Sequence, residues 1–130
     1  MKLFGIDHIT INCRDLEKSR RFYETVLKLP RLNEVDLGDH VLYYYQLPGT
    51  KLELISYRDP QKAWETGNTD TGIYRHFAVT TDNLDEIRAL CLAEGGKINM
   101  EPTWIPKLGN TVMLIADPNG VEIELILKQE

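Results

Sequence analysis

The sequence predicts an α+β fold in which one βαβββ unit occurs twice. Strand-like and helix-like segments follow each other in the same order in both halves of the chain. The 130 residues suffice for one domain with a hydrophobic core, and 42% hydrophobic with 27% charged residues is a globular composition. We therefore expect a single domain over residues 1–130.

Equivalent residues recur at nearly constant spacing, which supports the repeat. His8 and His76 are 68 positions apart, and so are Leu16 and Leu84 at the start of each expected helix. Near the end of each half, the stretch LELI at 52–55 matches IELI at 123–126, now 71 positions apart. A loop insertion of three residues accounts for the difference. Repetition of this kind indicates that each copy is one supersecondary unit.

The first unit is expected over residues 5–57. Residues 5–13 alternate apolar and polar side chains, as a half-buried strand does. Residues 15–28 have apolar side chains at helical spacing, and Asp15 can cap that helix. Residues 31–57 are expected to form three strands.

The second unit is expected over residues 74–127, after a polar, turn-rich linker at 58–73. Residues 74–81 alternate as a strand, and residues 84–94 have helical periodicity. Three more strands are expected at 97–101, 111–116 and 121–127. The unit therefore repeats the order βαβββ.

Strand parity places four potential metal ligands on equivalent faces. Successive side chains of a strand point to opposite faces of the sheet. Four of the expected strands have one strongly apolar face, which the amphipathic helices can cover. The opposite face carries a histidine or a glutamate in each of these strands: His8, Glu53, His76 and Glu124. If the sheets curve toward this face, the four side chains converge on one site. Glu122 shares the face of Glu124 and is a rival for the fourth position.

This ligand set indicates a catalytic divalent metal. Two imidazoles and two carboxylates suit Ni²⁺, Zn²⁺, Co²⁺, Mn²⁺ or Fe²⁺, and the lack of thiolates argues against a closed structural zinc site. Four ligands in a six-coordinate shell leave two positions for substrate oxygens. A metal there can stabilise an enediolate, and a ligating carboxylate can move a proton. Glu53 and Glu124 are the carboxylates that can do so.

Several polar side chains are expected near the site and in contact with a small-molecule substrate. Some share a strand face with the ligands, and one of the tyrosines at 43–45 must point to the same side. The expected substrate contacts on these faces are Thr10, Asn12, Tyr45 and Thr80.

Composition argues against several other classes of protein. A net charge of −5 disfavours binding to nucleic acid. No apolar run reaches the roughly 20 residues that span a bilayer, and the N-terminus lacks secretory features, so we expect a cytoplasmic protein. Cys13 and Cys91 are expected to be packing residues, because two cysteines without a CxxC pair do not make a disulfide framework.

The sequence resembles the vicinal oxygen chelate superfamily, also called the glyoxalase/bleomycin resistance/dioxygenase superfamily, over essentially its whole length. The resemblance lies in DHITINCRDLEKSRRFYETVLKLP at 7–30, KLELI at 51–55, RHFAVTTDNLDEI at 75–87 and DPNGVEIELI at 117–126. It implies that the two βαβββ modules form an open barrel-like sheet around one divalent metal, with the helices on the outer face. It also implies the ligands His8, Glu53, His76 and Glu124, with Glu124 preferred to Glu122, and a homodimer.

Within that superfamily, the complete ligand set most resembles glyoxalase I, a lyase that converts the adduct of a 2-oxoaldehyde and a thiol. The resemblance implies that a metal-bound glutamate moves the proton, with Glu124 as the first candidate and Glu53 as the second. Pro106 and Lys107 resemble the family's substrate-closing loop, so Lys107 is a further expected substrate contact. Two departures put glutathione in question as the thiol. Asn12 stands where an arginine usually holds a glutathione carboxylate, and Tyr57 stands where an asparagine is usual. The alternatives within the resemblance are an Fe²⁺-dependent ring-cleaving dioxygenase, an epimerase and an antibiotic-binding resistance protein.

Overall fold

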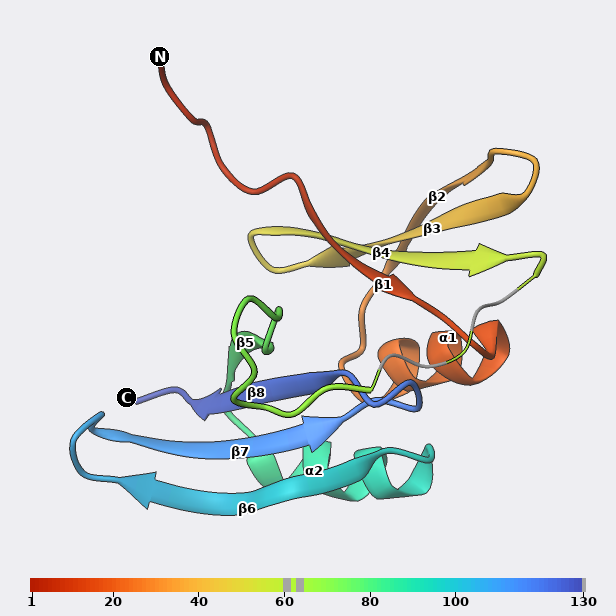
Figure 1. Ribbon diagram of the computed structural model, residues 1–130. Helices are drawn as coiled ribbons and strands as arrows, with labels where there is room; N and C mark the ends of the chain where they lie inside the picture. The colour runs from red at the N-terminus through yellow and green to blue at the C-terminus, as the bar shows by residue number, and fades with distance from the viewer. Residues whose placement is uncertain (60–61, 63–64, 130) are drawn as a thin grey trace.

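The computed structural model describes residues 1–59, 62 and 65–129, and its elements follow the predicted double repeat (Figure 1). The first copy comprises β1 (His8–Asn12), α1 (Leu16–Thr25), β2 (Arg31–Asp36), β3 (His40–Leu47) and β4 (Thr50–Tyr57). The second comprises β5 (Phe77–Thr81), α2 (Leu84–Ala93), β6 (Lys97–Ile105), β7 (Asn110–Ala116) and β8 (Glu122–Leu127). The α+β class and the order βαβββ are confirmed. The expected linker at 58–73 includes four residues, 60, 61, 63 and 64, that lie outside the described part.

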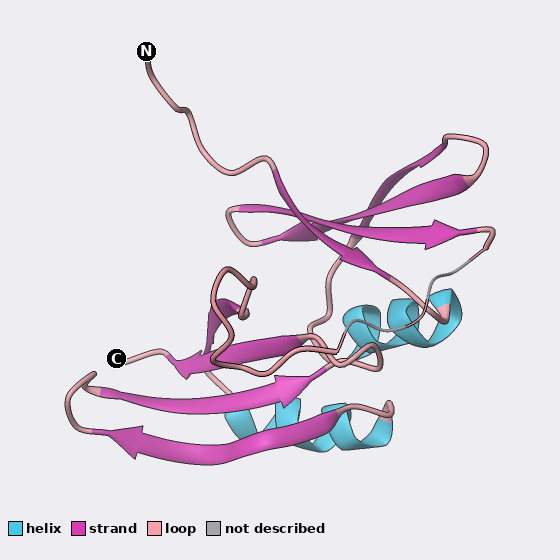
Figure 2. Cartoon of the chain, viewed as in Figure 1, coloured by secondary structure: helices cyan, strands magenta, loops and turns pink. Residues whose placement is uncertain are grey.

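Each copy forms its own four-stranded mixed sheet. The strand orders are β1-β4-β3-β2 and β5-β8-β7-β6. The first strand of each copy pairs parallel with the last, and the other pairs are antiparallel. The two sheets do not share a ladder, so β1 and β5 are both edge strands (Figure 2). The sheets are therefore open and are not closed into a barrel.

One hydrophobic core joins the two copies. Side chains alternate between the two faces of each sheet as expected. Ile11, Leu54 and Leu125 are buried on the faces that the helices cover. Helix α1 contributes Phe22 and Tyr23, and both are fully buried in the same cluster. The prediction that the two cysteines are packing residues is confirmed, since both are free and buried.

Each helix begins at a side-chain cap, and the sequence predicts the first of these at Asp15. The Asp15 carboxylate accepts a hydrogen bond from the Lys18 backbone N–H at 3.2 Å. At α2, the Asn83 side chain accepts one from the Glu86 backbone N–H at 3.0 Å. Both helices are ten residues long. Among the described helices, none has the length and the apolar run needed to cross a bilayer.

A buried carboxylate links the copies where the turn between β7 and β8 meets α1 (Figure 1). The Asp117 side chain is 3% exposed and accepts hydrogen bonds from the Tyr23 hydroxyl and from the backbone N–H groups of Asn119 and Val121, each at 2.8 Å. The Asn119 amide also donates to the Ser19 hydroxyl at 2.9 Å. Burial raises the pKa of Asp117, and burial beside that carboxylate raises the pKa of Tyr23.

Removing this carboxylate should destabilise the fold. We expect Asp117→Ala to lower the free energy of unfolding by about 3 kcal/mol, because several buried donors lose their acceptor. Urea denaturation followed by circular dichroism measures the change. Asp39→Ala is the control, since the Asp39 side chain is 79% exposed at a turn. A loss at Asp117 no larger than that at Asp39 would contradict the proposed role.

Candidate metal centre

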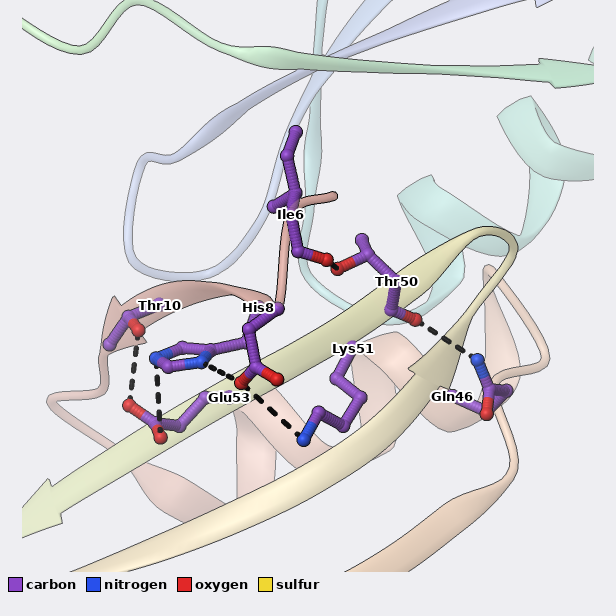
Figure 3. A network of polar contacts seen from close by, with 8 residues as sticks. Ile6, His8, Thr10, Gln46, Thr50, Lys51 and Glu53 are labelled. Atoms are coloured by element: carbon purple, nitrogen blue, oxygen red, sulfur yellow. Dashed lines mark hydrogen bonds and ion pairs between the residues drawn. The ribbon is translucent and has the colours of Figure 1, made fainter. Parts of the chain in front are cut away.

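The first copy brings His8 and Glu53 together. In the parallel register of β1 with β4, His8 lies opposite Lys51 and Thr10 lies opposite Glu53, so all four share one face. The distance from His8 Nε2 to Glu53 Oε2 is 3.7 Å, and the Thr10 hydroxyl donates to Glu53 Oε1 at 3.0 Å (Figure 3). The Glu53 side chain therefore points at the imidazole although the residue is only 5% exposed.

The second copy repeats this arrangement with His76 and Glu124. His76 Nε2 lies 3.8 Å from Glu124 Oε2. The predicted strand at 74–81 is wrong at its start, because β5 begins at Phe77 and His76 lies just before it. Parallel pairing of β5 with β8 sets Ala78 opposite Glu124, which brings the end of the preceding loop beside that carboxylate.

The structure separates the roles of Glu122 and Glu124. Glu122 is only 8% exposed, and its carboxylate contacts Arg75 Nη2 at 3.1 Å and the Asn99 amide at 3.3 Å. It also lies 3.2 Å from His76 Nδ1, on the side of the imidazole away from Nε2. Glu124 faces Nε2 itself. Sequence reasoning found no partner for Arg75, because its contact with Glu122 depends on how the loop before β5 approaches β8.

Each His–Glu pair has the chemistry of two ligands of one ion, and its two donor atoms lie somewhat farther apart than bound ligands do. Separations of 3.7 and 3.8 Å are too long for a hydrogen bond, whose usual limit is about 3.2 Å. Two donors that bind one ion at about 2.1 Å and at right angles lie about 3.0 Å apart. Small side-chain adjustments would close that difference. Imidazole nitrogen and carboxylate oxygen suit the divalent metals predicted from the sequence.

The chain does not bring the two pairs together into one cluster. In residues 1–59, 62 and 65–129, no group of three or more His, Cys, Asp or Glu side chains is arranged to hold a metal ion. His8 and Glu53 belong to one sheet, and His76 and Glu124 belong to the other. A four-ligand centre therefore needs the two pairs to meet in a further arrangement.

The tyrosine on the ligand face is Tyr44, and this corrects the choice of Tyr45. Tyr45 is fully buried on the helix side, where its hydroxyl accepts a hydrogen bond from Arg20 Nε at 2.9 Å. Tyr44 lies opposite Glu53 in the register of β3 with β4, and its ring stands edge-on to His8 at 6.2 Å between centroids. The neighbouring Glu53 carboxylate raises the pKa of Tyr44 to about 12. The register needed to choose between them comes from strand pairing.

The other expected substrate contacts lie on both edge strands and in one turn. Thr10 and Asn12 are exposed on the His8 face of β1, and Thr80 is exposed on the His76 face of β5. Lys107 lies in the exposed turn between β6 and β7. Register places this turn beyond the end of β8, because Asn110 precedes Val112, which pairs with Ile126.

A largely apolar cavity of about 740 Å³ lies beside the first pair. His8 and Thr10 line it from β1, and Ala78, the register partner of Glu124, lines it from β5. Apolar residues form most of the remaining wall: Ile6, Ile9, Leu47, Pro48, Tyr74, Phe77 and Val79. The cavity thus touches the ligand faces of both edge strands and has room for a small molecule.

Comparison with known proteins agrees with the fold and the double repeat. Lactoylglutathione lyase from Neisseria meningitidis is 32% identical, with 94% of this chain and 89% of that protein covered. A glyoxalase family protein from Bacillus cereus superposes with a TM-score of 0.81 at 16% identity, covering 100% of this chain and 97% of the other. Glyoxalase I from Zea mays superposes with a TM-score of 0.77 at 19% identity, covering 97% of this chain and 45% of that longer one.

The sequence also matches a protein-family profile over nearly its whole length. The sequence profile of the Glyoxalase/Bleomycin resistance protein/Dioxygenase superfamily matches residues 5–125. That span includes all four candidate ligands, the whole first copy of the βαβββ unit and all of the second copy except the last two residues of β8. The chain therefore belongs to the Glyoxalase/Bleomycin resistance protein/Dioxygenase superfamily.

Proposed function

We propose that this protein is a metal-dependent lyase of the glyoxalase I type. The observation that carries the proposal is the same His–Glu geometry in both repeats, with Nε2 to carboxylate distances of 3.7 and 3.8 Å. Relatives named lactoylglutathione lyase support the same class of reaction. The proposed substrate is a 2-oxoaldehyde–thiol adduct or a similar small α-hydroxycarbonyl compound.

The residues of the two pairs would hold one divalent ion per site. His8 and His76 would bind through Nε2, and Glu53 and Glu124 through the carboxylate oxygens that face those nitrogens. Ni²⁺, Zn²⁺, Co²⁺, Mn²⁺ and Fe²⁺ fit the donor set. When bound, such an ion supplies Lewis-acid stabilisation of negative charge on substrate oxygens.

The surroundings of the two glutamates favour Glu124 as the residue that moves the proton. Glu53 is only 5% exposed and accepts a hydrogen bond from the Thr10 hydroxyl, which restrains its carboxylate. Within the described part of the chain, the Glu124 carboxylate makes no hydrogen bond, and the side chain is 22% exposed. A carboxylate that is free to turn can take a proton from one substrate carbon and return it to the next.

We propose that a second copy of the chain completes each site. The two pairs lie in separate sheets, and β1 and β5 are edge strands with unpaired backbone groups. A two-fold homodimer can set the His8–Glu53 face of one chain against the His76–Glu124 face of the other, and the symmetry produces two such sites. The expected homodimer and the cytoplasmic location stay predictions from the sequence.

The residues around the His8–Glu53 pair do not specify which thiol forms part of the substrate. Asn12 ends β1 where the resemblance calls for an arginine, and Tyr57 ends β4 where it calls for an asparagine. Tyr57 stacks on His40 with ring centroids 4.7 Å apart. We propose Thr10, Asn12, Thr80 and Lys107 as substrate contacts, with Tyr44 replacing Tyr45.

Activity against the methylglyoxal–glutathione adduct tests the reaction, with Ni²⁺ and Zn²⁺ supplied separately. We expect Glu124→Gln to lower kcat by about 10²–10⁴-fold, because an amide cannot take up the proton. Glu101→Gln, at an exposed ion pair with Arg88, should leave kcat unchanged. Metal content measured in parallel separates loss of the base from loss of the ion. A full kcat in Glu124→Gln with normal metal content would rule out the assigned role.

Complementation tests whether each site is shared between chains. His8→Ala and His76→Ala should each be inactive, but dimers that contain one chain of each have one intact site. Equal mixing with subunit exchange should restore about a quarter of the wild-type activity. A site built within one chain would give no recovery, because every chain then carries a lesion. Co-expressed wild-type chains serve as the reference.

A further inference from the structure

Each candidate ligand histidine contacts a second carboxylate through Nδ1, the ring nitrogen that does not face its candidate ligand glutamate. His8 Nδ1 lies 2.7 Å from Asp7 Oδ2, and His76 Nδ1 lies 3.2 Å from Glu122 Oε2. In each case, Nε2 faces the candidate ligand glutamate on the other side of the ring. The two repeats reach this arrangement with different residues, since Asp7 precedes its histidine and Glu122 comes from β8.

The chemistry of imidazole gives this contact a consequence. A neutral imidazole carries one N–H, and the other nitrogen offers a lone pair. When Nδ1–H donates to a carboxylate, Nε2 is left with the lone pair that a metal needs. The same hydrogen bond fixes the rotation of the ring and increases the basicity of Nε2.

We propose that Asp7 and Glu122 are positioning residues that orient His8 and His76 for metal binding. The inference rests on the proposed function, because it concerns the same metal site. Neither carboxylate needs to touch the ion. Each acts through the imidazole that it contacts, and each turns an exposed or half-exposed histidine toward its glutamate.

Glu122 is suited to this task because its own position is determined by other residues. Arg75 Nη2 contacts Glu122 Oε2 at 3.1 Å, and the Asn99 amide donates to Oε1 at 3.3 Å. The residue is 8% exposed, so water competes little for these contacts. This environment also explains why Glu122 does not take the ligand position of Glu124.

Asp7 is held less firmly, so the two positioning contacts differ in strength. Its side chain is 76% exposed, and Lys51 Nζ lies 3.5 Å from the same oxygen that contacts His8. Solvent competes with an exposed hydrogen bond. We therefore expect a larger loss of metal affinity from a change at Glu122 than from one at Asp7.

The tautomer of each histidine can be tested without metal. Long-range ¹H–¹⁵N spectra of the metal-free protein at about pH 8, above the ordinary histidine pKa of about 6.5, distinguish Nδ1–H from Nε2–H imidazole. We expect Nδ1–H at His8 and at His76. In Asp7→Ala and Glu122→Ala, the corresponding imidazole should shift toward the Nε2–H form. Nε2–H imidazole at both positions in the wild-type protein would overturn the inference.

Zinc affinity tests the consequence for binding, with Zn²⁺ titrated against a competing chelator. We expect Asp7→Ala and Glu122→Ala to weaken Zn²⁺ binding by about 10- to 100-fold without changing the number of ions bound. Asp7→Asn and Glu122→Gln keep an oxygen that can accept from Nδ1–H, and should recover part of the loss. If the amide variants lose as much Zn²⁺ affinity as the alanine variants, the negative charge alone matters. That result would contradict the role assigned to the hydrogen bond from Nδ1–H.

Asp39→Ala is the matched control for this titration. Asp39 contacts His40 Nδ1 at 2.6 Å in the same neighbouring-residue arrangement as Asp7 and His8, but His40 is not a proposed ligand. It should leave Zn²⁺ affinity unchanged. If His8→Ala and His76→Ala also bind zinc normally, the proposed metal site fails. If those two lose zinc while the Asp7 and Glu122 variants bind as wild type does, only the positioning inference fails.

Discussion

The buried carboxylate of Asp117 joins the two repeats, and the placement of the candidate site depends on that junction. Its hydrogen bond from Tyr23 connects the turn between β7 and β8 to α1. The two copies also pack closely at Gly96 in the second copy. A Cβ at this position would lie 2.7 Å from the Phe22 ring of the first copy and 2.5 Å from the Cys91 sulfur. The repeats therefore meet through their helices and apolar faces, and the polar faces remain available for a site.

This packing explains why the described residues form two matching His–Glu pairs and no larger cluster of potential metal ligands. Within each repeat, parallel pairing of the first and last strands brings a histidine beside a glutamate. No comparable ladder connects β1 with β5, and the described residues contain no group of three or more potential metal ligands. The repeat thus builds each His–Glu pair locally, within one sheet.

Polar neighbours make the two halves similar in geometry but different in rigidity. Glu53 is buried and receives a hydrogen bond from Thr10, while Glu124 is more exposed. The difference in exposure is reversed for the carboxylates that contact Nδ1 of the histidines. Glu122, which contacts His76, is buried among polar partners, and Asp7, which contacts His8, is exposed. A site with one fixed and one mobile carboxylate suits chemistry in which a ligand also transfers a proton.

The sequence by itself determined the fold class, the double βαβββ order and the faces of His8, Glu53 and Glu124, because side-chain parity and internal repetition are local properties of the chain. Tertiary structure decided which tyrosine faces the ligands, since Tyr44 and Tyr45 are adjacent and only strand register distinguishes them. It also decided that His76 lies before its strand and that Glu122 contacts Arg75 and Asn99. These features depend on contacts between segments far apart in the chain, for which residue spacing carries no signal.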